Sequence, residues 1–259
     1  MKPLYENRTI NYETSLGLIM KTVVITQPTF LPWMGYFEQL AQADLVVWLD
    51  SVQFARRSWQ CRNTLKGTNA IPFWLTIPLK KQPRDTLLRD IRICQENPIW
   101  RTKHLQSIRG ALGKAPYFDS VNAWLEPIYC ANHEKLIDFN LEIINSVCNH
   151  MNIRFESVLS TELGVKSSKG NLILDLCKQV DATRYYSALG SREYLLPLNN
   201  EFFENGIELE FQKWEHPVYR QTGNTFVSHL SVIDALMNLG VGEVKAFLTP
   251  ATGKMHADD

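Results

Sequence analysis

The chain has 259 residues, of which 45% are hydrophobic, and its 27 Lys and Arg residues balance 27 Asp and Glu residues. This length and composition fit one large α/β domain, and the zero net charge argues against a general electrostatic grip on nucleic acid. Five scattered cysteines without a C-x-x-C pair favour reduced thiols in a cytoplasmic protein over disulfides or a zinc site. We expect no membrane span, because no stretch approaches the roughly 18 apolar residues that one requires.

The first ordered unit predicted by the sequence is a strand, a loop, a helix and a second strand. The strands at residues 22–26 and 45–49 are nearly continuous β-branched runs, as is typical of parallel strands covered on both faces. The loop covers residues 27–35 and the helix residues 36–43. Ligands of parallel sheets bind beyond the carboxyl ends of the strands, so we expect a ligand site at this edge.

Residues 73–79 are read as a strand and residues 88–93 alternate like another, and these two could form a small β-extension. The period of the hydrophobic pattern then changes. Helical spacing follows over residues 100–112, 117–129 and 135–151, which predicts a helical insertion at about residues 98–151.

Alternation of strands and helices then returns, with strands at residues 155–160, 183–187 and 208–211 and helices at residues 171–180, from 192 and at 231–239. This rhythm predicts a Rossmann-like parallel sheet, elaborated by the helical insertion and the β-extension. We expect one α/β domain over residues 20–248. Residues 1–19 lack the apolar core of a signal peptide and are interpreted as an extension or as sequence upstream of the native start, and residues 249–259 as a loose tail.

Residues 50–66 are read as a polar, basic loop with aromatic residues. Arg56, Arg62 and Lys66 concentrate positive charge, and arginine offers bidentate geometry for phosphate or carboxylate. The loop also carries groups that could bind a sugar hydroxyl or orient a base, namely Asp50, Gln53 and Asn63. The alternative is a solvated loop in which Asp50 pairs with an arginine.

The loop at residues 27–35 resembles the phosphate-facing turn of nucleotidylyltransferases and pantoate-activating ligases. Gln27 opens the loop, but the paired histidines of those enzymes are absent, and Trp33 and Tyr36 stand at the corresponding places. The alternative is a rigid, packed turn.

Four further residues are candidate binding groups. Ser168 and Lys169 precede a helix whose N-terminus could hold an anion, and N-capping explains Ser168 equally well. Ser187 ends a predicted strand at the ligand edge of the sheet, and His104 lies one helical turn after Trp100.

His216 is the best candidate for a general base, because the unperturbed pKa of histidine lies near neutrality. Tyr219 and Gln221 share a face with each other if this segment is extended. The alternative is a histidine that only makes structural hydrogen bonds.

Several of these pieces carry a resemblance to a known family. They include QPTFLPWMGYF, AD-x-VVWLD-x-VQF, RN-x-x-KG, WLTIPL, APYF, YYSALGS, FQ-x-x-x-HP-x-Y-x-Q and LSVIDALMNLG. Over about residues 20–248 the chain resembles WbqC-like proteins, a bacterial family often met in surface-polysaccharide gene clusters.

The resemblance implies a role in making a surface polysaccharide such as O-antigen. We expect transfer of an acyl or aminoacyl group to the amine of a nucleotide-linked amino sugar, with His216 and Asp50 as catalytic residues and the other candidates binding substrate. Two alternatives stay open: an ATP-dependent ligase or nucleotidylyltransferase-like enzyme, and a non-catalytic protein that presents a sugar precursor. No recognisable motif requires a cofactor, and ATP or an acyl donor are the candidates.

Overall fold

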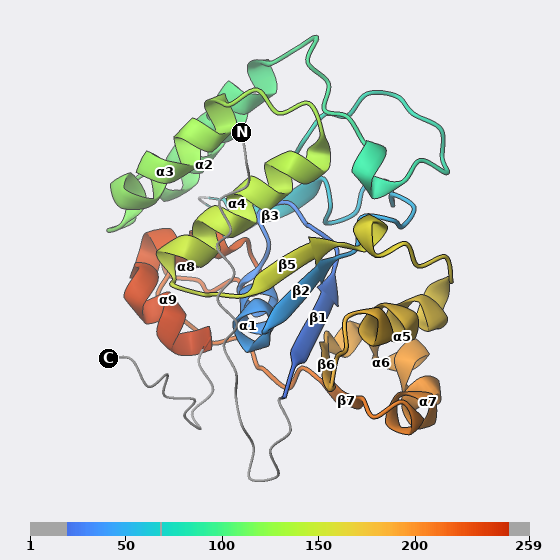
Figure 1. Cartoon of the computed structure of the whole chain (residues 1–259). Coiled ribbons are helices and arrows are strands. Elements are labelled where there is room, and N and C mark those ends of the chain that lie inside the picture. The colour runs from blue at the N-terminus through green and yellow to red at the C-terminus, as the bar shows by residue number, and fades with distance from the viewer. Residues whose placement is uncertain (1–19, 68, 249–259) are drawn as a thin grey trace.

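The structure is a computed structural model that describes residues 20–67 and 69–248. Its centre is a sheet of five parallel strands in the order β5-β2-β1-β6-β7 (Figure 1). The strands are β1 (Thr22–Thr26), β2 (Leu45–Trp48), β5 (Glu156–Leu159), β6 (Arg184–Ser187) and β7 (Glu208–Phe211). This confirms the predicted Rossmann-like parallel sheet. The predicted N-terminal extension, residues 1–19, and the predicted tail, residues 249–259, lie outside the described residues.

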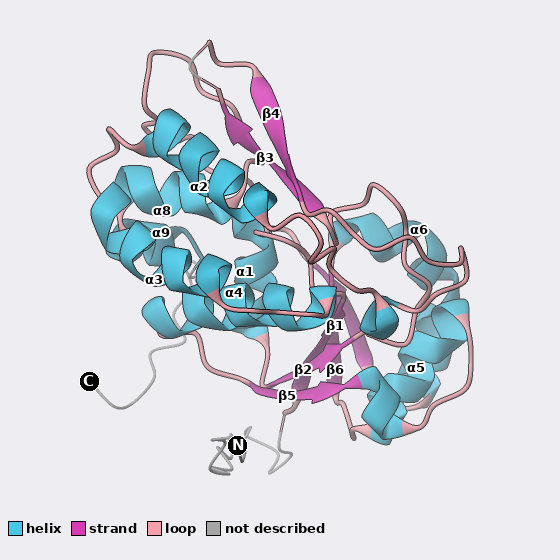
Figure 2. Cartoon of the chain, turned by 90° about the horizontal axis from the view of Figure 1, so that it is seen from above, coloured by secondary structure: helices cyan, strands magenta, loops and turns pink. Residues whose placement is uncertain are grey.

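Helices cover both faces of this sheet (Figures 1 and 2). One layer contains α1 (Met34–Gln42), α2 (Ile99–Leu112), α3 (Phe118–Cys130), α4 (Leu136–His150), α8 (Val232–Leu239) and α9 (Val241–Leu248). The other contains α5 (Lys169–Gln179), α6 (Arg192–Leu195) and α7 (Asn199–Glu204). Short 3-10 turns lie at Leu88–Asp90, Ser160–Leu163, Leu189–Ser191 and Leu196–Leu198.

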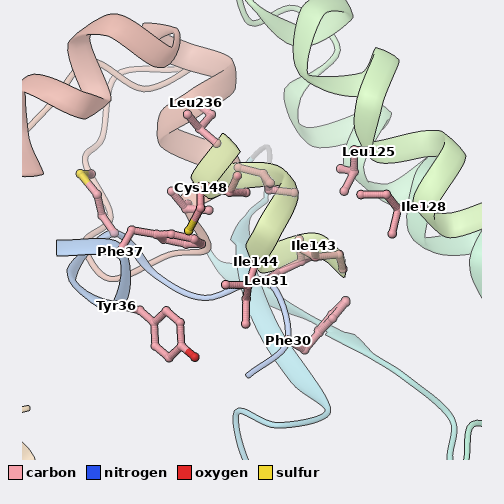
Figure 3. Close-up of a cluster of buried hydrophobic side chains, with 14 of the residues drawn as sticks. Phe30, Leu31, Tyr36, Phe37, Leu125, Ile128, Ile143, Ile144, Cys148 and Leu236 are labelled. Atoms are coloured by element: carbon pink, nitrogen blue, oxygen red, sulfur yellow. The ribbon is translucent and has the colours of Figure 1, made fainter. Parts of the chain in front are cut away.

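Alternation along the central strands divides the core in two. Val24 and Val46 pack into the first helical layer, and Val23 and Val47 into the second, because successive side chains of a strand point to opposite faces. Figure 3 shows the first core, where the loop before α1 and the start of α1 meet α4. Phe30 and Phe37 lie there beside residues of α4.

The order of the strands reverses between β1 and β6. The chain proceeds outward from β1 to β2 and β5, and then returns to the other side of β1 for β6 and β7. Ligands bind at the carboxyl ends of strands where an open parallel sheet changes direction in this way. The loop at residues 27–33 and the turn after Ser187 begin at that position.

A second sheet corrects the sequence prediction. Within the predicted loop at residues 50–66, β3 (Arg62–Lys66) forms an antiparallel hairpin with β4 (Pro72–Thr76). Figure 2 shows the hairpin beside α2. β3 was missed because only one of its five residues, Leu65, is hydrophobic. Asn63, Leu65 and Lys66 are buried, and Arg62 and Thr64 are partly buried.

The predicted β-extension was right in its first strand, since residues 73–76 lie in β4, but wrong in its second strand and in its pairing. Residues 73–79 and 88–93 do not form a ladder; they meet through a single bridge between Leu79 and Ile93, and Leu88–Asp90 is a 3-10 turn. Elsewhere the predicted helices begin or end within one or two residues of the observed ones. α9 was not predicted.

Candidate functional site

The open face of the β3–β4 hairpin carries charge and aromatic surface together. Arg62, Thr64 and Lys66 alternate along β3 on this face, and Trp74 pairs with Thr64 across the ladder. The Arg62 guanidinium lies 4.1 Å from the centre of the Trp74 ring, which in turn contacts Trp59 at 5.4 Å between ring centres. Arg62 and Lys66 are about 13 Å apart along the strand.

Backbone hydrogen bonds bring two other segments beside this hairpin. The Ser231 N–H donates to the Thr64 carbonyl over 3.1 Å, and Ser231 also bridges to Trp33. The Val232 N–H donates to the Pro32 carbonyl over 2.8 Å. The loop before α1, the segment before α8 and β3 therefore lie side by side.

Trp33 is the centre of a cluster of rings. Its ring lies parallel to His216, with 6.1 Å between ring centres, and 5.1 Å from His229. Trp214 packs edge-on at 5.7 Å. A Cβ at Gly35 would lie 2.3 Å from the Trp33 indole, so only glycine fits there. The indole thus covers the first turn of α1, where a nucleotidylyltransferase-like turn would receive phosphate.

Both ring nitrogens of His216 are engaged. Nδ1 lies 2.9 Å from the Pro217 carbonyl, which can only accept, so Nδ1 carries the proton. Nε2 accepts a hydrogen bond of 3.2 Å from the His229 N–H. Burial, with a smaller contribution from the adjacent His229 ring, lowers the pKa of His216, and the neutral imidazole is favoured.

Beneath the rings lies a buried carboxylate. Asp234 is fully buried, and its Oδ1 accepts hydrogen bonds from the Tyr219 hydroxyl at 2.8 Å and from Gln221 Nε2 at 3.0 Å. Its Oδ2 has no hydrogen-bond partner among the described residues. Burial raises the pKa of Asp234 to about 6, although the nearby Lys66 ammonium opposes the shift. Lys66 Nζ also donates to the carbonyls of Thr222 and Thr225.

Amide side chains fix the loop that leads from β1 to this site. Asn63 Nδ2 donates to the carbonyls of Phe30 and Leu31, at 3.2 and 2.6 Å. Gln27 accepts from the Gln60 amide, and its carbonyl accepts from the Tyr36 hydroxyl at 3.0 Å. Gln27, Tyr36 and Asn63 were predicted to bind substrate. In the structure these side chains instead make hydrogen bonds to backbone carbonyls or to another side-chain amide of the protein.

Asp50 lies apart from this group, at the carboxyl end of β2. Its carboxylate accepts hydrogen bonds from the Ser160 hydroxyl, the Thr161 N–H and the Thr161 hydroxyl, at 2.8, 3.0 and 2.6 Å. It is 1% exposed and forms an ion pair with none of the described arginines. The carboxylate therefore joins β2 to the turn after β5.

The other predicted site residues are dispersed. The Ser187 hydroxyl lies 2.6 Å from that of Ser191 at the end of β6. Gln53 and Arg56 are exposed and donate to the carbonyls of Arg84 and Gln82, at 2.6 and 3.0 Å. Ser168 is the N-cap residue of α5 without a side-chain cap, and Lys169 is its first residue.

His104 is buried in the helical layer. Its Nε2 lies 3.2 Å from the Thr76 carbonyl and its Nδ1 3.4 Å from the Tyr129 hydroxyl. Burial lowers the pKa of His104 to about 4. These contacts join α2 to β4 and to α3.

Five residues at the site were not among the predicted ones: Trp59, Trp74, Trp214, His229 and Asp234. Asp234 carried a usable signal, because a carboxylate inside the apolar run LSVIDALMNLG must be buried with partners. The ring contacts depend on the approach of distant segments and leave no signal in one sequence.

The described residues contain neither a metal-binding cluster nor a membrane-spanning helix. No group of three or more His, Cys, Asp and Glu residues there could hold a metal ion. No helix there is long and apolar enough to cross a membrane.

Fold and site define an α/β protein with a Rossmann-like parallel sheet and a basic, aromatic hairpin beside it. The chain matches the WbqC-like protein family over residues 27–246 and belongs to that family. It is similar to the uncharacterized protein Rv1507c of Mycobacterium tuberculosis, with 28% identity over 224 residues, which are 85% of this chain and 95% of that protein. No solved structure matches the chain.

Proposed function

We propose that this protein is a cytoplasmic enzyme of bacterial surface-polysaccharide synthesis that binds a nucleotide-linked amino sugar and transfers an acyl or aminoacyl group to the sugar amine. The observation that carries the proposal is the meeting of cations, aromatic rings and imidazole beside the switch point of the sheet. Arg62 and Lys66 share one face of β3. Trp33, which stacks on His216, pairs with Ser231 in the segment beside β3. Diphosphate and sugar need this combination of charge and flat apolar surface.

In the proposed reaction the amine nitrogen attacks the carbonyl carbon of an activated acyl donor such as a thioester. The carbon–nitrogen bond forms and the carbon–sulfur bond breaks. His216 Nε2 accepts the proton that the amine loses and passes it to the leaving thiolate. For this, the substrate amine must replace the His229 N–H, whose 3.2 Å hydrogen bond is long.

The test is turnover of a UDP- or dTDP-linked amino sugar with a panel of acyl-CoA donors. We expect His216→Asn to lower kcat by about 100-fold or more while the Kd for the nucleotide sugar stays within a few-fold, since proton transfer by a positioned side chain contributes 10²–10⁴-fold. The matched control is His150→Asn, because His150 is exposed on α4 and stacks on Trp124. Equal turnover by His216→Asn and the native protein would contradict the assignment of the base.

A second candidate function is a non-catalytic protein that presents a sugar precursor. The observation that favours it is the engagement of both His216 nitrogens by the protein's own backbone. It predicts nucleotide-sugar binding with no turnover for any acyl donor. ATP-dependent ligation is less well supported, since the Trp33 indole occupies the space over the first turn of α1.

A further inference from the structure

The segment from residue 51 to residue 84 is strongly biased in charge. It contains seven cationic residues and no Asp or Glu, in a chain whose net charge is zero. The cationic residues are Arg56, Arg57, Arg62, Lys66, Lys80, Lys81 and Arg84. None of them belongs to any of the four ion pairs among the described residues. Such a segment attracts an anion.

Two exposed tryptophans lie within the same segment. Trp59 is 52% exposed and Trp74 is 46% exposed, and their rings are 5.4 Å apart at 38°. The backbone of Trp59 is fixed, because its carbonyl accepts a 2.8 Å hydrogen bond from the Phe30 N–H. The indoles therefore form a supported aromatic surface next to the loop from β1.

Arg62 completes this surface. Its guanidinium is held over Trp74 by a cation–π contact and makes no hydrogen bond or ion pair with any described residue. Its Nε is buried without an acceptor. An arginine positioned by stacking keeps its fork of donors for a phosphate.

We propose that Trp59 stacks on the nucleobase of a nucleoside diphosphate whose phosphates bind Arg62. This deepens the proposed function and rests on it, because it assigns the nucleotide half of the substrate to the hairpin. A single base fits better than a nucleic-acid strand: one exposed indole pair offers a platform for one ring, and the net charge of the chain is zero. The sugar then extends toward Ser231, which is hydrogen-bonded to β3, and toward Trp33, which pairs with Ser231.

The test is calorimetric titration with UDP, dTDP and glucosamine 1-phosphate. Because stacking of a base on an aromatic side chain is worth 1–3 kcal/mol, Trp59→Ala should weaken UDP binding by between about 5-fold and 150-fold. Trp59→Phe should retain most of the affinity, and binding of glucosamine 1-phosphate should not change. Trp124→Ala is the matched control, since Trp124 stacks on His150 in the helical layer.

Three results would overturn the inference: unchanged UDP affinity in Trp59→Ala, an equal loss of glucosamine 1-phosphate affinity, or Trp59-dependent binding to phosphatidylglycerol vesicles without UDP binding. Its failure is distinct from that of the proposed function. Trp59-dependent UDP binding without acyl transfer would sink only the transfer reaction. Acyl transfer by Trp59→Ala with a native KM would sink only the nucleobase site.

Discussion

Asp234 shows at the scale of one residue how burial sets chemistry. Its carboxylate lies inside an apolar helix, where three hydrogen bonds to Oδ1, from Tyr219, Gln221 and Asn238, only partly compensate for the loss of water. A buried acid whose pKa is raised binds its proton more tightly in the folded state than in the unfolded state. Folding is then opposed by ionisation, and the stability of the protein depends on pH.

We expect Asp234→Asn to remove this dependence. The native pKa is about 6 and the reference value is 3.8, so this residue's contribution to stability is fully present below about pH 4 and is lost as the pH rises through 6. A shift of this size corresponds to about 3 kcal/mol. Asparagine keeps the acceptor for Tyr219 and cannot ionise. The measurement is the free energy of unfolding in urea between about pH 4 and pH 8. As the pH rises, this free energy should increase for the variant relative to the native protein.

Parallel pH profiles for the two proteins would contradict this account. They would mean that the Asp234 carboxylate has the same affinity for its proton in the folded and unfolded chains.

At the scale of elements, the site depends on how the hairpin is attached to the body. β3 is joined to the sheet's first loop by Asn63, whose amide donates to the carbonyls of Phe30 and Leu31. Leu31 has a φ of 44°, which is unfavourable for a leucine. Its burial and the hydrogen bond from Asn63 hold it in this conformation. Asn63 therefore positions the loop that carries Trp33.

We expect Asn63→Ala to cost about 1–3 kcal/mol, because two buried carbonyls lose their donor. The measurement is the free energy of unfolding in urea. Asn122→Ala is the matched control, since Asn122 lies on α3 with an exposed hydrogen bond to Glu126 and should change stability by less than about 0.5 kcal/mol. Equal stability of the two variants would show that the loop holds its conformation without Asn63.

At the scale of the whole molecule, the parallel sheet could be predicted because its strands are continuous apolar runs. Residues 22–26 and 45–49 are such runs, and period and length together identify them. β3 could not be predicted in this way, because its outer face is occupied by Arg62, Thr64 and Lys66. A strand whose alternate residues are polar on both sides looks like a loop in one sequence.

The candidate site was predicted in part, for the same reason. Arg62, Lys66, Trp33, His216 and Tyr219 were selected from their chemistry, and the structure brings them near one another. Asp50, His104 and Ser187 were selected by the same reasoning, and the structure places them elsewhere. The partners of Asp50 and Trp33 lie more than 100 residues away in the chain, at Ser160 and at His216, and no local pattern records such contacts.

The most direct measurement is calorimetric binding of a UDP- or dTDP-linked amino sugar to the native protein, Arg62→Ala and Arg101→Ala. Arg101 is the matched control, because its guanidinium also stacks on an indole, that of Trp100, at 4.7 Å. The account predicts binding that falls about tenfold or more in Arg62→Ala, since hydrogen bonds to charged groups contribute about 1.5–3 kcal/mol, and that is unchanged in Arg101→Ala. Binding that is equal in all three proteins, or absent from the native protein, would contradict the hairpin face as the substrate site.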